Sequence, residues 1–175
     1  MVFNKKSQFN KTDFEEAVLD IARVTRVVAG GKRLSFRATV AVGNKGKHQV
    51  GIGVDKGKDV SQAIQKASNK AKKNLITVPI VNNTIPHEIT AKYKAAEVII
   101  KPAPKGKGII AGGAVRTVLK LADVPDAIAK ILGNTSNAIN NARVTILALS
   151  KLKIPPEKSK PKKNNHADPS IEKTG

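Results

Sequence analysis

The clearest pattern along the chain is an alternation of apolar and polar side chains over residues 33–42. Apolar side chains occupy the even positions, which are Leu34, Phe36, Ala38, Val40 and Val42. Polar side chains occupy the odd positions up to residue 39, which are Arg33, Ser35, Arg37 and Thr39. A period of two is typical of a half-buried antiparallel strand. The pattern predicts a strand with one face in the core and a basic opposite face.

Turn-forming residues on both sides of this segment predict two hairpins. Residues 30–31 (GG) precede it and residues 44–47 (NKGK) follow it. Glycine and asparagine tolerate the positive φ that tight hairpin turns need. Apolar positions then continue at a spacing of two, at Val50, Ile52 and Val54. Residues 18–54 are therefore expected to form three strands joined by two tight turns.

The period becomes helical after residue 58. Asp59 stands at a helix N-cap position. Apolar side chains recur over residues 59–75 at helical spacing, at Val60, Ala63, Ile64, Ala67, Ala71 and Leu75. Another face of the same helix carries Lys66, Lys70 and Lys73. Two interpretations of these lysines stay open, a solvated helix surface or a surface that binds a polyanion.

The second half of the chain repeats this organisation after a connector at residues 76–84, which contains a proline and two asparagines. The expected elements are strands within 85–93 and 96–103, a helix over 112–122, a short strand within 127–132 and a helix over 137–152. The inward side chains of the first of these helices are Val115, Val118, Leu119 and Ala122. Two small α+β domains are therefore expected, at residues 12–80 and 81–152. Residues 1–11 are expected to form a flexible extension, and residues 153–175, with little apolar surface to bury, a disordered basic tail.

The net charge of the chain indicates which class of partner it binds. Lys and Arg number 32 against 13 Asp and Glu among 175 residues, which gives a formal net charge of +19. Such an excess favours polyanions as partners. Aromatic residues make up 3% of the chain, too few for a platform on which bases stack. Binding to RNA is therefore expected to depend on phosphate contacts and shape.

Several function classes are excluded or disfavoured by residue type. The chain has no cysteine, so disulfides and thiolate metal sites are excluded. The histidines His48, His87 and His166 lack a ligand-like spacing, and no metal is expected. No uncharged apolar run reaches the roughly 20 residues of a membrane span, and no signal peptide is recognisable. We expect a cytoplasmic protein.

A glycine-rich stretch at residues 106–116, GKGIIAGGAVR, resembles a loop that cradles a phosphate. Gly106, Gly108 and Gly112 are one residue too widely spaced for the dinucleotide fingerprint, and no P-loop pattern occurs at Gly53–Lys58. Three interpretations stay open. The glycines could hold a nucleic-acid phosphate at a helix N-terminus, permit close packing or a protein contact, or hold a mononucleotide.

Catalytic constellations are not recognisable in the sequence. No Ser-His-Asp order with the glycines of a nucleophile elbow occurs, and no pair of carboxylates falls on a recognisable face. Two functions stay open, a small-molecule phosphotransferase that uses residues 106–113 and a free-standing regulator that binds double-stranded RNA.

Three segments resemble the bacterial ribosomal small-subunit protein five family. They are residues 23–75, which begin RVTRVVAGGKRLSF, residues 101–124 (KPAPKGKGIIAGGAVRTVLKLADV) and residues 134–149 (NTSNAINNARVTILAL). The resemblance covers residues 12–152 in family order. It implies an α+β fold, with a first domain like a double-stranded-RNA-binding domain, a three-stranded antiparallel sheet with a helix. The second domain is implied to be of βαβα type with a left-handed crossover.

For function, the resemblance implies a structural constituent of the small ribosomal subunit and not an enzyme. Its implied partners are 16S rRNA, the neighbouring small-subunit proteins four and eight, and messenger RNA at the entry channel, where it supports translational accuracy. No cofactor, small-molecule substrate or membrane is implied. The implied location is the cytoplasmic 30S subunit and 70S ribosome.

The resemblance also implies three groups of site residues. Contacts with RNA are expected from Arg23, Arg26, Lys32, Arg33, Arg37, Lys45 and Lys47. A loop near the decoding and spectinomycin region is expected at Thr25, Val28, Ala29, Gly30 and Gly31. An interface with protein four is expected at Gly106, Gly108, Gly112, Gly113 and Arg116. Ala29 stands where many relatives carry lysine, which weakens the expected phosphate contact of the loop.

Overall fold

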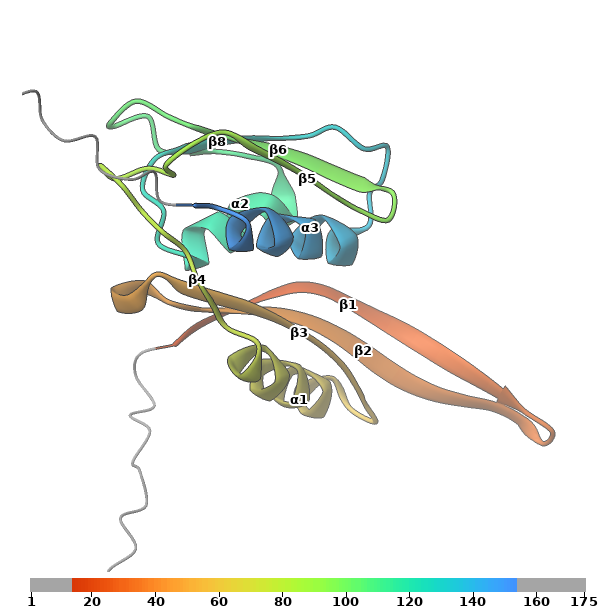
Figure 1. Ribbon diagram of the computed structural model, residues 1–175. Helices are drawn as coiled ribbons and strands as arrows, with labels where there is room; N and C mark the ends of the chain where they lie inside the picture. Colours follow the sequence, from red (N-terminus) through yellow and green to blue (C-terminus); the bar gives the residue numbers. More distant parts are fainter. Residues whose placement is uncertain (1–13, 154–175) are drawn as a thin grey trace, which may run out of the picture.

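The computed structural model describes residues 14–153 (Figure 1). The expected extension at residues 1–11 lies outside the described residues, as does the expected tail apart from Lys153. Two four-stranded sheets and three α-helices form the described part. The elements stack in the order second sheet, helices α2 and α3, first sheet and helix α1 (Figure 1). The α+β class expected from the sequence is confirmed.

The first sheet has the order β1-β2-β3-β4, with every neighbouring pair antiparallel. Its strands are β1 (Glu15–Val28), β2 (Gly31–Asn44), β3 (Gln49–Gly57) and β4 (Ile76–Thr77), and the 3₁₀ turn η1 (Lys45–Lys47) joins β2 to β3. The sequence predicts three strands and a connector after the helix. Ile76 instead pairs with Val50 and packs against the core, which adds a short fourth strand.

Helix α1 (Val60–Lys73) covers one face of the first sheet. Asp59 occupies the N-cap position as expected, although its side chain makes no capping hydrogen bond. Small side chains on both elements form the contact, which contains Ala38, Val40, Val42, Ala63, Ala67 and Ala71. Gly53 brings β3 against the helix backbone, because a Cβ there would overlap the carbonyl oxygen of Ala67. Alanine and glycine thus let α1 approach the sheet closely.

The sequence predicts that the opposite face of β2 is basic, but only part of that face is. Thr39 and Ala41 are completely buried, because α2 and α3 cover this part of the face. The expected core residue Leu34 is 49% exposed. It lies where β1 and β2 extend beyond α1 as a two-stranded ribbon (Figure 1). Tertiary packing therefore buries both faces of β2 at one end and neither face fully at the other.

The second sheet has the order β5-β6-β8-β7. Its strands are β5 (Ile89–Tyr93), β6 (Ala96–Pro102), β7 (Ile109–Ile110) and β8 (Ala127–Ile131). Strands β7 and β8 are parallel, and α2 (Gly113–Leu121) connects them. The sequence does not predict β7, a strand of two residues inside the glycine-rich stretch. The four side chains expected to point inward from α2 and its C-cap are all buried.

Helix α3 (Ala138–Ser150) closes the core between the two sheets. The Asn137 side chain caps it by accepting hydrogen bonds from the N–H groups of Ile139 and Asn140. One hydrophobic cluster extends from Ala41 and Val50 of the first sheet to both helices and the second sheet. Gly43 permits close contact between β2 and α2, because a Cβ there would overlap the Leu121 backbone. The β1–β2 ribbon thus projects from a platform in which both sheets share a core.

Candidate nucleic-acid interface

The projecting part of β1 and β2 carries most of the residues expected to bind RNA. The two strands stay paired from Arg23 opposite Phe36 to Val28 opposite Gly31, and Ala29 and Gly30 form the turn. Gly31 has φ +132°, a conformation that side chains rarely adopt. All five residues of the expected decoding-region loop therefore lie together at or beside the tip of this ribbon, which we call the hairpin (residues 21–38).

Cations occur on both faces of the hairpin. Directly paired residues share a face of a sheet, so Arg26 and Arg33 lie side by side on one face. Arg23, opposite Phe36, and Lys32, opposite Val27, lie on the other face, the one that α1 covers further along the sheet. The hairpin can therefore present positive charge in two directions.

The Arg26–Arg33 pair has no acidic partner in the described part of the chain. Neither arginine forms an ion pair with another residue of the described range 14–153. Like charges directly opposite each other on a sheet are destabilising. Phosphate oxygens would remove this repulsion, because guanidinium groups bind them through charge-assisted hydrogen bonds. The pair is therefore suited to an anionic partner.

Arg37 differs from the other hairpin arginines because Asp20 already pairs with it. The Arg37 Nη2 atom lies 3.4 Å from the Asp20 carboxylate, and both side chains are about one-third exposed (34% and 36%). Arg37 faces the same side as Arg33, four residues closer to the platform. Its pairing with Asp20 is set by the register of β1 and β2, which sequence reasoning did not include.

Lys45 and Lys47 lie away from the hairpin tip. They follow the far end of β2, a 14-residue strand, and are therefore about 45 Å from Gly31. Lys45 Nζ lies 2.9 Å from the Glu15 carboxylate. A hydrogen bond from Lys45 lowers the pKa of the Glu15 carboxyl, and the same bond raises the pKa of Lys45. The seven cations expected to bind RNA thus form two separate groups.

The glycine-rich stretch is organised around an internal carboxylate. Asp126, which is 4% exposed, accepts hydrogen bonds from the backbone N–H of Gly106 at 3.1 Å and of Gly108 at 2.6 Å. Both glycines have positive φ, +85° and +72°, which favours glycine over other residues. The Asp126 carboxylate thus satisfies both of these N–H groups. The mononucleotide interpretation therefore loses these two donors and keeps only the N–H groups at the start of the helix that begins at Gly113.

Asp126 was missed because it lies 18 residues after Gly108 in sequence. Strands β7 and β8 are parallel, and Ile109 pairs with Ala127. The residues immediately before these two, Gly108 and Asp126, must therefore lie side by side. Recognition of Ile109 as the start of a short parallel strand would have revealed this contact.

The remaining residues of the expected protein interface lie at the start of α2. Gly112 is the N-cap, and its carbonyl oxygen accepts a hydrogen bond from the N–H of Arg116. Gly112, Gly113 and Arg116 are exposed. A Cβ on Gly113 would meet no atom within 4 Å, so packing inside the chain does not require this glycine. These residues thus form an open surface beside the Asp126 loop.

Residues 14–153 contain no cluster of histidine and carboxylate side chains that could hold a metal ion. In the same range, no helix has the length and apolar character that a membrane crossing needs.

The fold and its surface define a basic α+β protein with a protruding cationic hairpin, the class of protein that assembles with polyanions.

Comparison with known proteins narrows this class to one family. The family model "Ribosomal protein S5, N-terminal domain" matches residues 14–79, and "Ribosomal protein S5, C-terminal domain" matches residues 91–161. The chain belongs to the ribosomal protein S5 family and is a structural constituent of the small ribosomal subunit. This family is not enzymatic, which agrees with the absence of a catalytic constellation in the sequence.

Individual relatives agree with the family models. The chain is 50% identical over 150 residues to small ribosomal subunit protein uS5 of Nostoc punctiforme, a match that covers 85% of each chain. It is 48% identical to the uS5 protein of Thermotoga neapolitana over 80% of this chain and 78% of the relative. It is 51% identical to the uS5c protein of Spinacia oleracea, over 86% of this chain and 49% of that protein. The chain thus spans about half the length of the spinach relative.

Proposed function

We propose that the chain binds 16S rRNA mainly through the hairpin, with Arg23, Arg26, Lys32 and Arg33 as phosphate ligands. The single observation that carries this proposal is the Arg26–Arg33 pair, which has no acidic partner among residues 14–153. The hairpin also leaves apolar surface in solvent, since Val27 is 75% exposed and Leu34 is 49% exposed. A partner that covers this surface and balances the charge accounts for both features.

The other cations are proposed to have secondary roles. Arg37 lies at the base of the hairpin and can contact a phosphate while Asp20 orients its guanidinium group. Lys45 and Lys47, at the far end of β2, are proposed to contact a separate rRNA segment. The negative charge of Glu15 offsets the positive charge of Lys45, so Lys47 is the stronger phosphate ligand of the two.

The hairpin tip is proposed to lie near the decoding region, where it supports translational accuracy. This role rests on the family resemblance of Thr25, Val28, Ala29, Gly30 and Gly31. The small side chains at Ala29 and Gly30 leave the backbone of the turn open to close approach by RNA. The basic residues beside the tip are proposed to line the messenger entry channel.

The second sheet and its helices are proposed to provide contacts with proteins. Gly106, Gly108, Gly112, Gly113 and Arg116 are proposed to face small-subunit protein four, with protein eight as another neighbour. The hydrogen bonds from Gly106 and Gly108 to Asp126 support this assignment, because they hold the loop in one shape. We also propose that residues 12–80 and 81–152 are the two domains, and that the subunit is cytoplasmic.

A binding experiment with paired variants tests the main proposal. The affinity of the full chain for 16S rRNA is measured by filter binding between 50 and 300 mM KCl, with Arg26→Gln/Arg33→Gln as the hairpin variant. Loss of two phosphate contacts is expected to reduce the slope of log affinity against log salt by about 1.5 to 2. Lys92→Gln/Lys130→Gln, on exposed positions of the second sheet, removes the same charge as a control. Equal losses in both variants would refute a specific role of the hairpin.

A further inference from the structure

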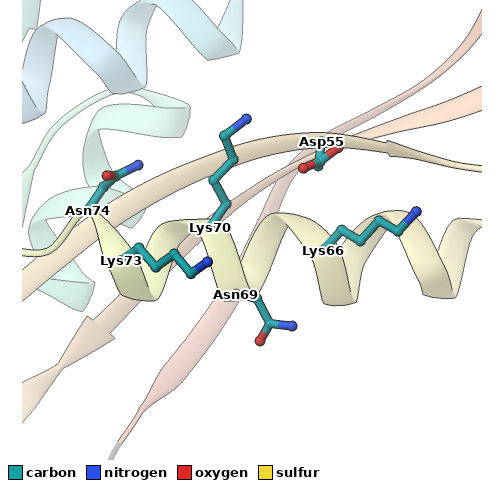
Figure 2. A pocket seen from close by; sticks show the side chains of 6 residues that line it. All are labelled: Asp55, Lys66, Asn69, Lys70, Lys73 and Asn74. Carbon is teal, nitrogen blue, oxygen red and sulfur yellow. The ribbon is translucent and has the colours of Figure 1, made fainter.

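A second cationic surface lies on α1, outside the hairpin. Lys66, Lys70 and Lys73 border a hollow of about 490 Å³, together with Asn69, Asn74 and Asp55 of β3 (Figure 2). All the lining residues except Asp55 are exposed, and none is apolar. We call this surface the α1 hollow.

The charge of the α1 hollow is not balanced by ion pairs within the described part of the chain. Within residues 14–153, none of its three lysines forms an ion pair. Lys72, on another side of the same helix turn, is paired with Glu16 at 2.8 Å. The one carboxylate in the hollow, Asp55, accepts a hydrogen bond from the backbone N–H of Lys56. Three cations and one anion therefore leave an excess of two positive charges.

An RNA backbone fits this surface better than a protein does. Protein–protein interfaces have apolar centres and few lysines, whereas the α1 hollow is lined by three lysines, two asparagines and an aspartate, with no apolar residue. Ammonium groups bind phosphates as point charges, and amide side chains such as Asn69 also donate to phosphate and sugar oxygens. Lys66, Lys70 and Lys73 are spaced about 6 and 4.5 Å along the helix axis. They form a row that can follow successive phosphates.

A structural role is the competing explanation for the same lysines. Strand β4 pairs only with Gln49 and Val50, so β3 has no partner within residues 14–153 on its outer edge from Gly51 to Gly57. Asp55 in this stretch borders the α1 hollow. Lysines beside an open edge prevent a strand of another molecule from pairing with it. This role predicts self-association, not loss of RNA binding, when the lysines are replaced.

We infer that the α1 hollow binds the ribose-phosphate backbone of an RNA strand, as a second RNA contact separate from the hairpin tip. The choice of RNA as partner rests on the proposed function. The lysine row lies on the helix-covered side of the first sheet, the side that Arg23 and Lys32 also face. An RNA strand that follows this side can therefore contact both surfaces.

The test uses the full chain with the substitutions Lys66→Gln, Lys70→Gln and Lys73→Gln combined. The control combines Lys92→Gln, Lys130→Gln and Lys151→Gln, which removes the same charge from exposed positions of the second sheet and the C-cap of α3. Binding to a fluorescein-labelled oligouridylate of about 12 nucleotides is measured by anisotropy as KCl is varied. The salt slope of the α1 variant is expected to fall by about 2, since each phosphate contact on a single strand contributes about 0.7. The control slope is expected to stay close to that of the original chain.

Other outcomes separate this inference from the proposed function. Equal binding by the α1 variant and the control, with a loss only in Arg26→Gln/Arg33→Gln, would overturn the inference and leave the hairpin proposal intact. Self-association of the α1 variant with unchanged RNA binding would assign the lysines to edge protection and overturn the inference. A larger loss of binding to polyglutamate than to oligouridylate would point to an acidic protein and also overturn it. Failure of the unsubstituted chain to bind 16S rRNA would refute the proposed function itself.

Discussion

The Asp126 carboxylate accepts a 2.6 Å hydrogen bond from the backbone N–H of Gly108. The glycine-rich stretch therefore binds an anionic side chain of the same protein. A second bond, from the N–H of Gly106, completes the arrangement. The stretch resembles a phosphate-binding loop because its backbone N–H groups also bind an anion, which here is the Asp126 carboxylate. Gly106 and Gly108 serve the conformation of the loop, whereas Gly112, Gly113 and Arg116 are exposed at the start of α2.

Replacement of Asp126 is expected to loosen this loop. Asp126→Asn offers one acceptor in place of two, so the new buried amide N–H₂ group faces a backbone N–H and has no acceptor there. An unsatisfied buried donor costs about 1–3 kcal/mol. For a protein of this size, that corresponds to a fall in Tm of roughly 3–10 °C, measured by circular dichroism. Asp123→Asn, at a half-exposed position, is the control, and an equal fall in both variants would contradict the role of Asp126.

A contact between β1 and α1 predicts a pH dependence of stability. The Glu16 carboxylate accepts hydrogen bonds from Lys72 Nζ at 2.8 Å and Ser68 Oγ at 2.5 Å. Partial burial opposes ionisation, but the bonds from Lys72 and Ser68 outweigh it and lower the pKa of Glu16. A lowered pKa in the folded state means that this stabilisation is present above the unfolded-state pKa of about 4.3. It is lost as pH falls through the folded-state value.

The variant Glu16→Gln tests this dependence. Urea unfolding of the variant at pH 7 is expected to show a loss of less than about 1 kcal/mol, because the pair is more than one-third exposed. The difference from the original chain is expected to shrink as pH falls from 5 to 3. A difference that stays constant over this range would show that the ionised form of Glu16 does not contribute.

The close approach of β3 and α1 predicts a strong effect of a single methyl group. In Gly53→Ala the new Cβ would overlap the Ala67 carbonyl oxygen, so the helix must move away from the sheet. Such overpacking costs about 1–3 kcal/mol, measured as a lower urea midpoint. Gly46→Ala is the control, because the nearest atom to its Cβ would be 3.9 Å away and its φ is not positive. Equal stability of the two variants would contradict this packing.

Charge at the hairpin tip is expected to affect binding without affecting the fold. Gly31→Asp and Gly31→Asn impose similar backbone strain at φ +132° and differ by one negative charge. Because no atom lies within 4 Å of the new Cβ, both variants are expected to keep a Tm within a few degrees of the original. Gly31→Asp is expected to bind 16S rRNA more weakly and to impair decoding or alter the response to spectinomycin. Unfolding of the first sheet by either variant would show that the tip has a structural role.

The local patterns of the sequence predict most elements of the fold. Alternation identifies β2 and β3, and helical spacing identifies α1, α2 and α3 with their buried faces. The patterns do not predict which solvent-facing positions a second layer covers. Thr39 looks polar in isolation, and its complete burial arises only from the packing of α2 against β2 in the folded chain. The strands β4 and β7, with two residues each, are too short to form a period.

The candidate site was predictable where it depends on local sequence. Gly30 and Gly31 mark the hairpin tip, and the nearby cations follow from the sequence alone. The pairing of Arg37 with Asp20 and of Lys45 with Glu15 joins residues 17 and 30 positions apart, so it depends on strand register. The distance of Lys45 and Lys47 from the hairpin tip likewise depends on the length of β2, which the alternation over residues 33–42 shows only in part.

Sedimentation of a cell lysate through a sucrose gradient tests the central claim most directly. The fractions are probed for this chain in moderate and in high salt, with Arg26→Gln/Arg33→Gln and Lys92→Gln/Lys130→Gln expressed separately for comparison. We predict that the chain is present in equal number with small subunits and 70S ribosomes, and that the hairpin variant dissociates from them at lower salt than the control. Recovery of the unsubstituted chain only in light, ribosome-free fractions would contradict its place in the small subunit.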